Sequence, residues 1–247
     1  MSMTLHVLGS SSAGNGYILD AEDGALVIEA GMPLHEVLRM TGYRLPHIKG
    51  CVVSHEHRDH ARYAGEYMGM GVRVLALPSV LASACTWSNI FGTAAAPKHA
   101  YMIGAYKIIA LPVAHDVPCL AFVIDHGEMG RLAFVTDTMM LEYKLSRVNH
   151  LLVEANYCDE ILDRNISRGA VAAAERSRLT HSHMELKTAV GVAKANMWKG
   201  LSEIVLIHLS PRNSDAETFR GEMEKATGIP TYVARPGMKI QLKHKTV

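Results

Sequence analysis

The fold of this chain is decided by one short stretch, Cys51-Val52-Val53-Ser54-His55-Glu56-His57-Arg58-Asp59-His60. The apolar residues at its start predict the end of a buried strand, and a helical pattern begins at His60. The histidines and the aspartate between them therefore lie on a tight loop at the carboxyl end of a strand. Open α/β sheets keep their functional sites at such strand ends.

The spacing within this loop predicts ligands for two metal ions. His55 and His57 alternate with other residues, so both can face one side of an extended segment. Asp59 and His60 turn onto the following helix and can face a second point nearby. The chain holds 14 histidines, and neutral imidazole is the commonest metal ligand in proteins. The alternative is a polar loop with scattered histidines, which the density of the pattern disfavours.

Two ions need more than four ligands, and three later strands each deliver one at or just beyond their last residue. His115 follows Leu111–Ala114, Asp137 follows Leu132–Thr136, and His208 follows Ile204–Ile207. For any one alone, a polar residue that caps a strand is the better interpretation. Together with the loop, they favour a dinuclear site of five imidazoles and two carboxylates. Such a donor set suits Zn²⁺, with Mn²⁺ or Fe²⁺ as alternatives.

Short β-rich runs alternate with helical patterns along the whole chain, which predicts an α/β fold with a mixed sheet covered by helices. Lys107–Val113, Leu120–Asp125 and Leu132–Thr136 are expected to form adjacent hairpin-like strands. No linker or repeat divides the chain, so we expect one domain over residues 1–247. The predicted helices include Pro78–Asn89, Thr138–Arg147, Asp159–Leu179 and Met184–Lys199.

Composition excludes several classes of function. The 25 Lys and Arg against 24 Asp and Glu leave a formal net charge of +1, so any polyanion must be bound locally and not by bulk charge. No apolar run approaches the roughly 20 residues of a membrane span, and the start lacks the pattern of a signal peptide. The four cysteines are far apart, which predicts reduced thiols in a cytoplasmic protein: Cys51, Cys85, Cys119 and Cys158.

Beyond the loop, several motifs resemble those of the metallo-β-lactamase fold hydrolases, and among them the YycJ-like (WalJ) exonuclease branch, with RNase Z as a more distant relative. The resemblance rests on Leu8-Gly9-Ser10-Ser11-Ser12-Ala13-Gly14-Asn15-Gly16, His115-Asp116, Thr136-Asp137-Thr138, Val153-Glu154-Ala155-Asn156 and His208-Leu209-Ser210-Pro211-Arg212-Asn213. Two motifs depart from the family pattern. Glu29 stands where the family usually has aspartate, and Thr180-His181-Ser182 lacks the glycine that normally precedes its histidine.

The resemblance implies a four-layer αββα sandwich with two divalent metal ions, and it suggests a homodimer. His55, His57 and His115 would hold one ion, Asp59, His60 and His208 would hold the other, and Asp137 would bridge them. Two divalent cations with two aspartates and a bridging hydroxide keep roughly one positive charge, which suits an anionic substrate. The hydroxide between the ions would be the nucleophile.

The same resemblance assigns the remaining site residues. Glu154 and His181 would form a general acid pair that protonates the departing oxygen, with Asp59 counted among the catalytic residues as well as the ligands. His183 is the rival for the role of His181 and is otherwise expected to bind substrate. His181 could alternatively be a helix-terminal residue without a catalytic role.

Three further residues are expected to contact substrate. Ser11 and Asn15 belong to the loop Gly9–Gly16, whose backbone N–H groups could bind phosphate, or which could be a plain tight turn. Arg212 could pair a phosphate or form a surface salt bridge.

The leading functional hypothesis is a metal-dependent phosphodiesterase that hydrolyses nucleic acid, as in the YycJ-like branch. One alternative is a cyclic-nucleotide phosphodiesterase similar to the phage anti-Pycsar enzymes of this fold, which the near-neutral charge favours. Another is a non-catalytic scaffold that binds metal for structure or sensing. A closed four-ligand site would suit the scaffold better than the seven ligands predicted here.

Overall fold

Two seven-stranded mixed sheets form the centre of the protein. The computed structural model describes residues 3–84 and 90–244. The first sheet has the strand order β14 (Lys239–Leu242), β1 (Met3–Ser11), β2 (Gly14–Ala21), β3 (Gly24–Ile28), β4 (Ile48–Val53), β5 (Val74–Ala76) and β6 (Gly92–Ala94). The second has the order β13 (Thr231–Val233), β12 (Glu203–Ile207), β11 (His150–Glu154), β10 (Gly130–Val135), β9 (Cys119–His126), β8 (Tyr106–Val113) and β7 (Ala100–Ile103).

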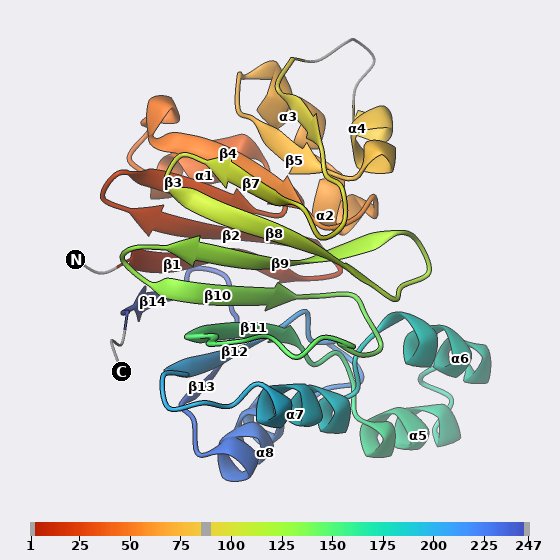
Figure 1. Cartoon of the computed structure of the whole chain (residues 1–247). Helices are drawn as coiled ribbons and strands as arrows, with labels where there is room; N and C mark the ends of the chain where they lie inside the picture. Colours follow the sequence, from red (N-terminus) through yellow and green to blue (C-terminus); the bar gives the residue numbers. More distant parts are fainter. Residues whose placement is uncertain (1–2, 85–89, 245–247) are drawn as a thin grey trace.

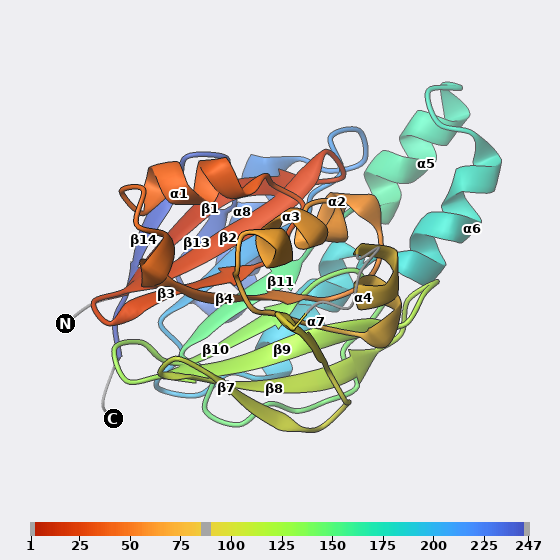
Figure 2. The same cartoon turned by 90° about the horizontal axis from the view of Figure 1, so that it is seen from above.

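Helices cover the outer face of each sheet, which completes the predicted αββα sandwich (Figures 1 and 2). The first sheet is covered by α1 (Leu34–Met40), α2 (Arg58–Ala61), α3 (Ala64–Gly69) and α4 (Pro78–Ala84), and a 3-10 turn spans Leu45–His47. The second is covered by α7 (Leu186–Ala195) and α8 (Ala216–Thr227), while α5 (Asp159–Ser167) and α6 (Ala173–Ser182) extend beyond the strand ends. Among the described residues, no helix has the length and apolar character needed to cross a membrane.

Alternation along the strands explains how the second sheet is buried on both faces. In β10 and β11, Leu132, Phe134 and Leu152 pack into the core between the sheets. Their neighbours Ala133 and Val153 pack instead into a second core beneath α7 and α8. Successive residues of a strand point to opposite faces, so these continuously apolar strands fit the middle layers of a sandwich.

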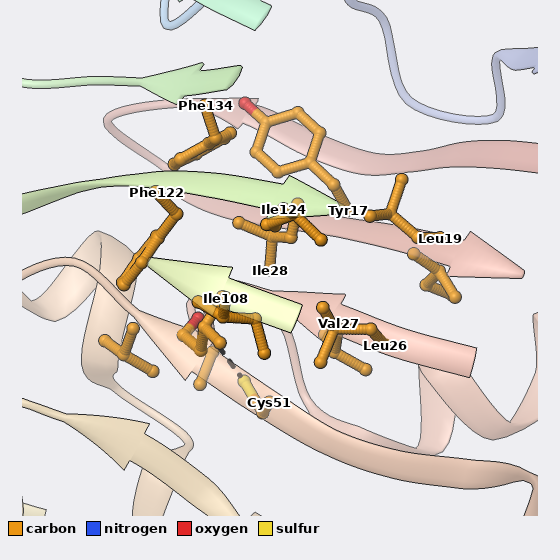
Figure 3. Close-up of a cluster of buried hydrophobic side chains, with 14 of the residues drawn as sticks. Tyr17, Leu19, Leu26, Val27, Ile28, Cys51, Ile108, Phe122, Ile124 and Phe134 are labelled. Carbon is orange, nitrogen blue, oxygen red and sulfur yellow. Dashed lines mark hydrogen bonds between the residues drawn. The ribbon is translucent and has the colours of Figure 1, made fainter. Parts of the chain in front are cut away.

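The aromatic ring of Tyr17 joins the two sheets. Its ring centroid lies 5.4 Å from that of Phe134 in an edge-to-face arrangement, and both side chains are fully buried (Figure 3). The Tyr17 hydroxyl donates a hydrogen bond to Ser10 Oγ at 2.8 Å, and Ser10 Oγ also accepts the backbone N–H of His208 at 2.9 Å. The core is thereby connected to the strand ends where the predicted ligands lie.

The three predicted hairpin-like strands are confirmed as β8, β9 and β10, which pair antiparallel in that order. Two helix predictions differ from the structure. Thr138–Arg147 is an irregular segment, because Asn196 Oδ1 and the Arg131 guanidinium hydrogen-bond its backbone. Asp159–Leu179 is divided into α5 and α6 at Gly169, whose φ of +70° cannot continue a helix. The predicted helix Pro78–Asn89 is described only to Ala84, and its remainder, with Cys85, lies outside the described residues.

Candidate metal centre

The predicted ligands meet at one edge of the sandwich because the strands that deliver them run in the same direction within each sheet. The loop His55–His60 follows β4, whereas His115, Asp137 and His208 follow β8, β10 and β12. In the second sheet, β10, β11 and β12 are parallel, and β8 runs parallel to them through two antiparallel pairings. The two sheets therefore present their ligand-bearing ends to each other.

The donor atoms form groups small enough to surround single ions. His55, His57 and His115 form one group within 4.8 Å, and Asp59, His60 and His208 form another. Asp137 belongs to two further groups, one with His55 and His60 and one with Glu154, His183 and His208. The side chains of each predicted set thus lie together, and Asp137 lies near members of both sets.

The unpaired imidazole nitrogen of His55 fits a metal ligand. His55 Nδ1 lies 2.8 Å from Ser54 Oγ, which fixes the ring, while Nε2 is buried with no hydrogen-bond partner among the described residues. A buried nitrogen without a partner is costly in a folded protein. A divalent ion would satisfy it, since a metal-bound histidine commonly donates its other ring N–H to a neighbouring oxygen. The residues present therefore fit a metal centre.

The electrostatics keep three of the predicted ligands in the protonation states that metals require, His55 and His115 neutral and Asp59 ionised, whereas the neighbouring carboxylates raise the pKa of His60 and His208. Burial and the neighbouring imidazoles, that of His60 first, hold the pKa of His55 well below its ordinary value. Burial likewise lowers the pKa of His115. Burial alone would raise the pKa of Asp59, but its hydrogen bonds with His208 and His60 outweigh that effect and hold it far below the usual range.

Two of the predicted ligands have unusual backbone conformations. Asp137 has φ of +47° and His208 has φ of +54°, both in the left-handed region that non-glycine residues rarely adopt. Asp137 is the second residue after β10, and His208 is the first residue after β12. At both positions the chain turns sharply out of the sheet. Such strain persists where surrounding structure imposes it, typically at functional sites.

Gly31 allows the ligand loop to approach β3. A Cβ atom at this position would lie 1.8 Å from the backbone oxygen of Asp59, so no larger residue fits without moving the loop. Glu29, two residues earlier, fixes the same loop: Glu29 Oε2 accepts the Ser54 N–H at 3.2 Å, and Oε1 lies 3.5 Å from His60 Nδ1. Glu29 thus contacts both the backbone of the loop and the ring of His60.

The predicted pairing of Glu154 with His181 is wrong. Glu154, buried at the end of β11, lies with Oε1 2.7 Å from His183 Nδ1 and 3.2 Å from His208 Nδ1. His183 Nδ1 is also 3.2 Å from Asp137 Oδ1. His181 is exposed on the last turn of α6, and its Nδ1 donates to Ser177 O of its own helix at 2.6 Å. His183, the alternative considered for this role, therefore occupies the position beside Glu154 that was expected for His181.

Carboxylates dominate the surroundings of His183. Burial lowers the pKa of this imidazole, but the nearby Glu154 and Asp137 carboxylates raise it more, to about 10. The side chain keeps some contact with solvent, whereas Glu154 is fully buried. The carboxylates therefore favour the protonated form of the His183 imidazole, which lies between the buried Glu154 and solvent.

The predicted substrate contacts are distributed differently from expectation. Asn15 is 1% exposed, and its Nδ2 lies 3.0 Å from His60 Nε2, so it contacts a predicted ligand directly and is buried, contrary to the expected substrate contact. Ser11 pairs with Gly14 at the end of the β1–β2 hairpin, which supports the tight-turn interpretation of Gly9–Gly16. Arg212 lines a cavity that also contains His183.

Two residues that the sequence reasoning left out also lie at this site. Asp116 Oδ1 is 2.9 Å from His115 Nε2 and 3.5 Å from His57 Nε2, and its position next to His115 was the available signal. Arg178 lines the same cavity as His183, and no sequence pattern marked it.

No family model matches the chain. The exodeoxyribonuclease YycJ of Bacillus anthracis is 26% identical, with 66% of this chain and 66% of that protein aligned, so the chain spans about two thirds of the length of this curated relative. The metallo-β-lactamase fold protein YhfI of Bacillus subtilis superposes with a TM-score of 0.77 at 19% identity, covering 98% of this chain and all of that one. A diphosphatase of the PhnP family superposes with a TM-score of 0.71 at 16% identity, covering 100% and 99%.

Proposed function

Because the chain has the metallo-β-lactamase fold, we propose that it is a metal-dependent phosphodiesterase acting on nucleic acid or nucleotides. The observation that supports this most is the contact of His183 with both Glu154 and Asp137, which sets a proton donor beside the predicted ligands. The relation to an exodeoxyribonuclease and the fold shared with a diphosphatase agree with a phosphate ester as substrate.

The ligand assignment is part of this proposal. His55, His57 and His115 would hold one divalent ion, Asp59, His60 and His208 a second, and Asp137 would contact both. Two such ions supply an activated water as nucleophile and positive charge for the phosphate oxygens. The donor set of five imidazoles and two carboxylates suits Zn²⁺ or Mn²⁺.

The reaction also needs a proton for the departing oxygen, and His183 would supply it. Nδ1 of His183 is occupied by Glu154 at 2.7 Å, which orients the ring and leaves Nε2 for the departing oxygen. Glu154 is itself held by the backbone N–H groups of Thr138 and Met184, each at 3.2 Å. A rigid carboxylate that fixes one imidazole nitrogen makes the other a directed general acid.

The test is a substrate panel with the metal-reconstituted protein: single-stranded DNA, RNA, 2′,3′- and 3′,5′-cyclic nucleotides, and bis(p-nitrophenyl) phosphate. We expect hydrolysis of a polynucleotide with about two ions bound per chain. Turnover of cyclic nucleotides alone would favour the second candidate, which the net charge of +1 supports. One tightly held ion and no hydrolysis of any ester would overturn the proposal in favour of a scaffold.

A further inference from the structure

A small cavity opens beside the proposed proton donor. Its volume is about 230 Å³, and His183 and His208 form part of its wall. It extends from the metal centre toward α6 and the segment after β12, and its cations are Arg178 and Arg212. No aspartate or glutamate lines it among the residues that the structure describes. Its wall is therefore suited to a negatively charged group.

The position of the cavity determines which part of a substrate it would hold. A general acid touches the oxygen that leaves, so the space on its side of the reacting phosphorus belongs to the leaving group. His183 lies in the wall of this cavity and, through Glu154, is oriented from behind. The atoms beyond the departing oxygen would thus enter the cavity.

Arg178 and its neighbour Arg176 have different surroundings on α6. The Arg176 guanidinium pairs with Asp159 Oδ1 at 3.1 Å and with Asp163, which ties α6 to α5. Arg178 is exposed, and no ion pair of its guanidinium is found within residues 3–84 and 90–244. Arg176 thus holds α5 and α6 together, whereas Arg178 lies in the wall of the cavity.

Asn156 adds an unsatisfied acceptor to the same wall. Its Nδ2 donates to the backbone oxygen of His208 at 2.8 Å, which fixes the amide. Its Oδ1 is buried and accepts no hydrogen bond among the described groups. A buried acceptor without a donor is unfavourable, and a sugar hydroxyl or a base N–H would supply one. A nucleotide carries both kinds of group, since its phosphate is anionic and its sugar and base have hydrogen-bond donors.

We propose that this cavity is a subsite for a leaving nucleotide and that Arg178 binds the phosphate which that nucleotide carries. The inference rests on the proposed function and narrows its substrate class to oligonucleotides or polynucleotides. A cyclic nucleotide has a single phosphate, and its departing oxygen stays on the same nucleoside, so it offers no second phosphate to Arg178.

The kinetic test compares the dinucleotide TpT with pTpT and TpTp, which place an extra phosphate on one nucleoside or the other. Product analysis shows which nucleoside leaves. The substrate with the phosphate on the leaving nucleoside should have a kcat/KM about tenfold above that of TpT, because a charge-assisted contact is gained. In Arg178→Gln this advantage should fall to about twofold or less. Arg168→Gln, an exposed arginine at the end of α5 outside the cavity, should keep it.

A binding measurement separates failure of the inference from failure of the proposed function. Thymidine 3′,5′-bisphosphate carries both candidate phosphates on one nucleoside, and its affinity can be measured by calorimetry without turnover. Arg178→Gln should weaken this affinity about five- to tenfold, and Arg168→Gln should leave it unchanged. If the protein binds this probe through Arg178 but hydrolyses no ester, the subsite stands and the phosphodiesterase does not. Equal kcat/KM values for TpT and both phosphorylated forms, or an advantage that survives Arg178→Gln, would overturn the subsite.

Discussion

The Glu154 carboxylate lies 2.7 Å from His183 Nδ1, and this contact links the fully buried end of β11 to a partly exposed imidazole in the wall of the cavity. Because a buried carboxylate is stable only when paired, Glu154 and His183 stabilise each other's charged forms. Burial raises the pKa of Glu154, but the charge of His183 and the hydrogen bonds from His183 and His208 together lower it below its ordinary value. The pair is the structural basis for the first two predictions.

Removal of His183 should affect substrates according to their leaving groups. His183→Ala is expected to slow hydrolysis of a natural phosphodiester by about 10²–10⁴-fold, the usual contribution of a general acid. Hydrolysis of bis(p-nitrophenyl) phosphate should be slowed far less, since p-nitrophenolate leaves without a proton. The matched control is His181→Ala, two residues away and bonded only within its own helix, which should leave both rates near wild type. A selective loss in His181→Ala would return the acid to that residue.

Glu154→Gln should impair both metal binding and proton donation. Glu154 Oε1 contacts Nδ1 of the proposed ligand His208 as well as that of His183. Loss of such a charged acceptor behind a ligand typically lowers metal affinity by about 10–100-fold. Competition with a chelator measures the affinity, and it should fall in Glu154→Gln but not in His183→Ala. Equal affinities in all three proteins would contradict the link between Glu154 and His208.

Replacement of the proposed ligands should lower metal content. His57→Ala removes a ligand of one ion and Asp137→Ala removes the residue between both groups, so each should abolish hydrolysis, with the larger metal loss in Asp137→Ala. His47→Ala is the control, since its imidazole pairs with Asp20 at 2.7 Å and not with the ligand groups. Elemental analysis of the number of metal ions per chain checks the predicted loss in both variants. Two ions and a normal rate in either ligand variant would refute the assignment.

Stability in acid should depend on Asp20, which pairs with His6 and His47 and belongs to none of the predicted ligand groups. Burial raises its pKa, but the contacts with His6 at 3.5 Å and His47 at 2.7 Å lower it more, so the folded protein has the lower pKa. Its contribution is therefore complete above the unfolded value of about 4 and is lost as the pH falls through the folded pKa. Asp20→Asn should lower the free energy of unfolding by about 1 kcal/mol at pH 7. The difference from wild type in urea unfolding should shrink below about pH 4, and a difference that is constant with pH would count against this origin.

The sequence patterns predicted the buried strands and the positions of the candidate ligands after them, because both depend on local order along the chain. They predicted one mixed sheet, whereas the structure has two, and the four-layer arrangement was expected only from the resemblance to a known fold. Apolar runs identify buried strands, and a parallel arrangement brings the residues after them to one edge. Hence His115, Asp137 and His208 could be placed beside the loop after β4 without knowledge of any distance. The alternation that buries β10 and β11 on both faces is likewise a property of the sequence.

Only the tertiary structure decided which histidine meets Glu154, and the reason is where α6 ends. His181 lies within the last helical turn, so its ring follows the helix and bonds Ser177 O. His183 is the first residue beyond the helix, with an extended backbone at φ −134° and ψ 158°, and this turns its ring back toward the end of β11. The ends of helices are the part of secondary structure that a sequence pattern defines least precisely. The histidine that contacts Glu154 is therefore the one just beyond α6, and Arg178, within the helix, lies in the wall of the cavity beside it.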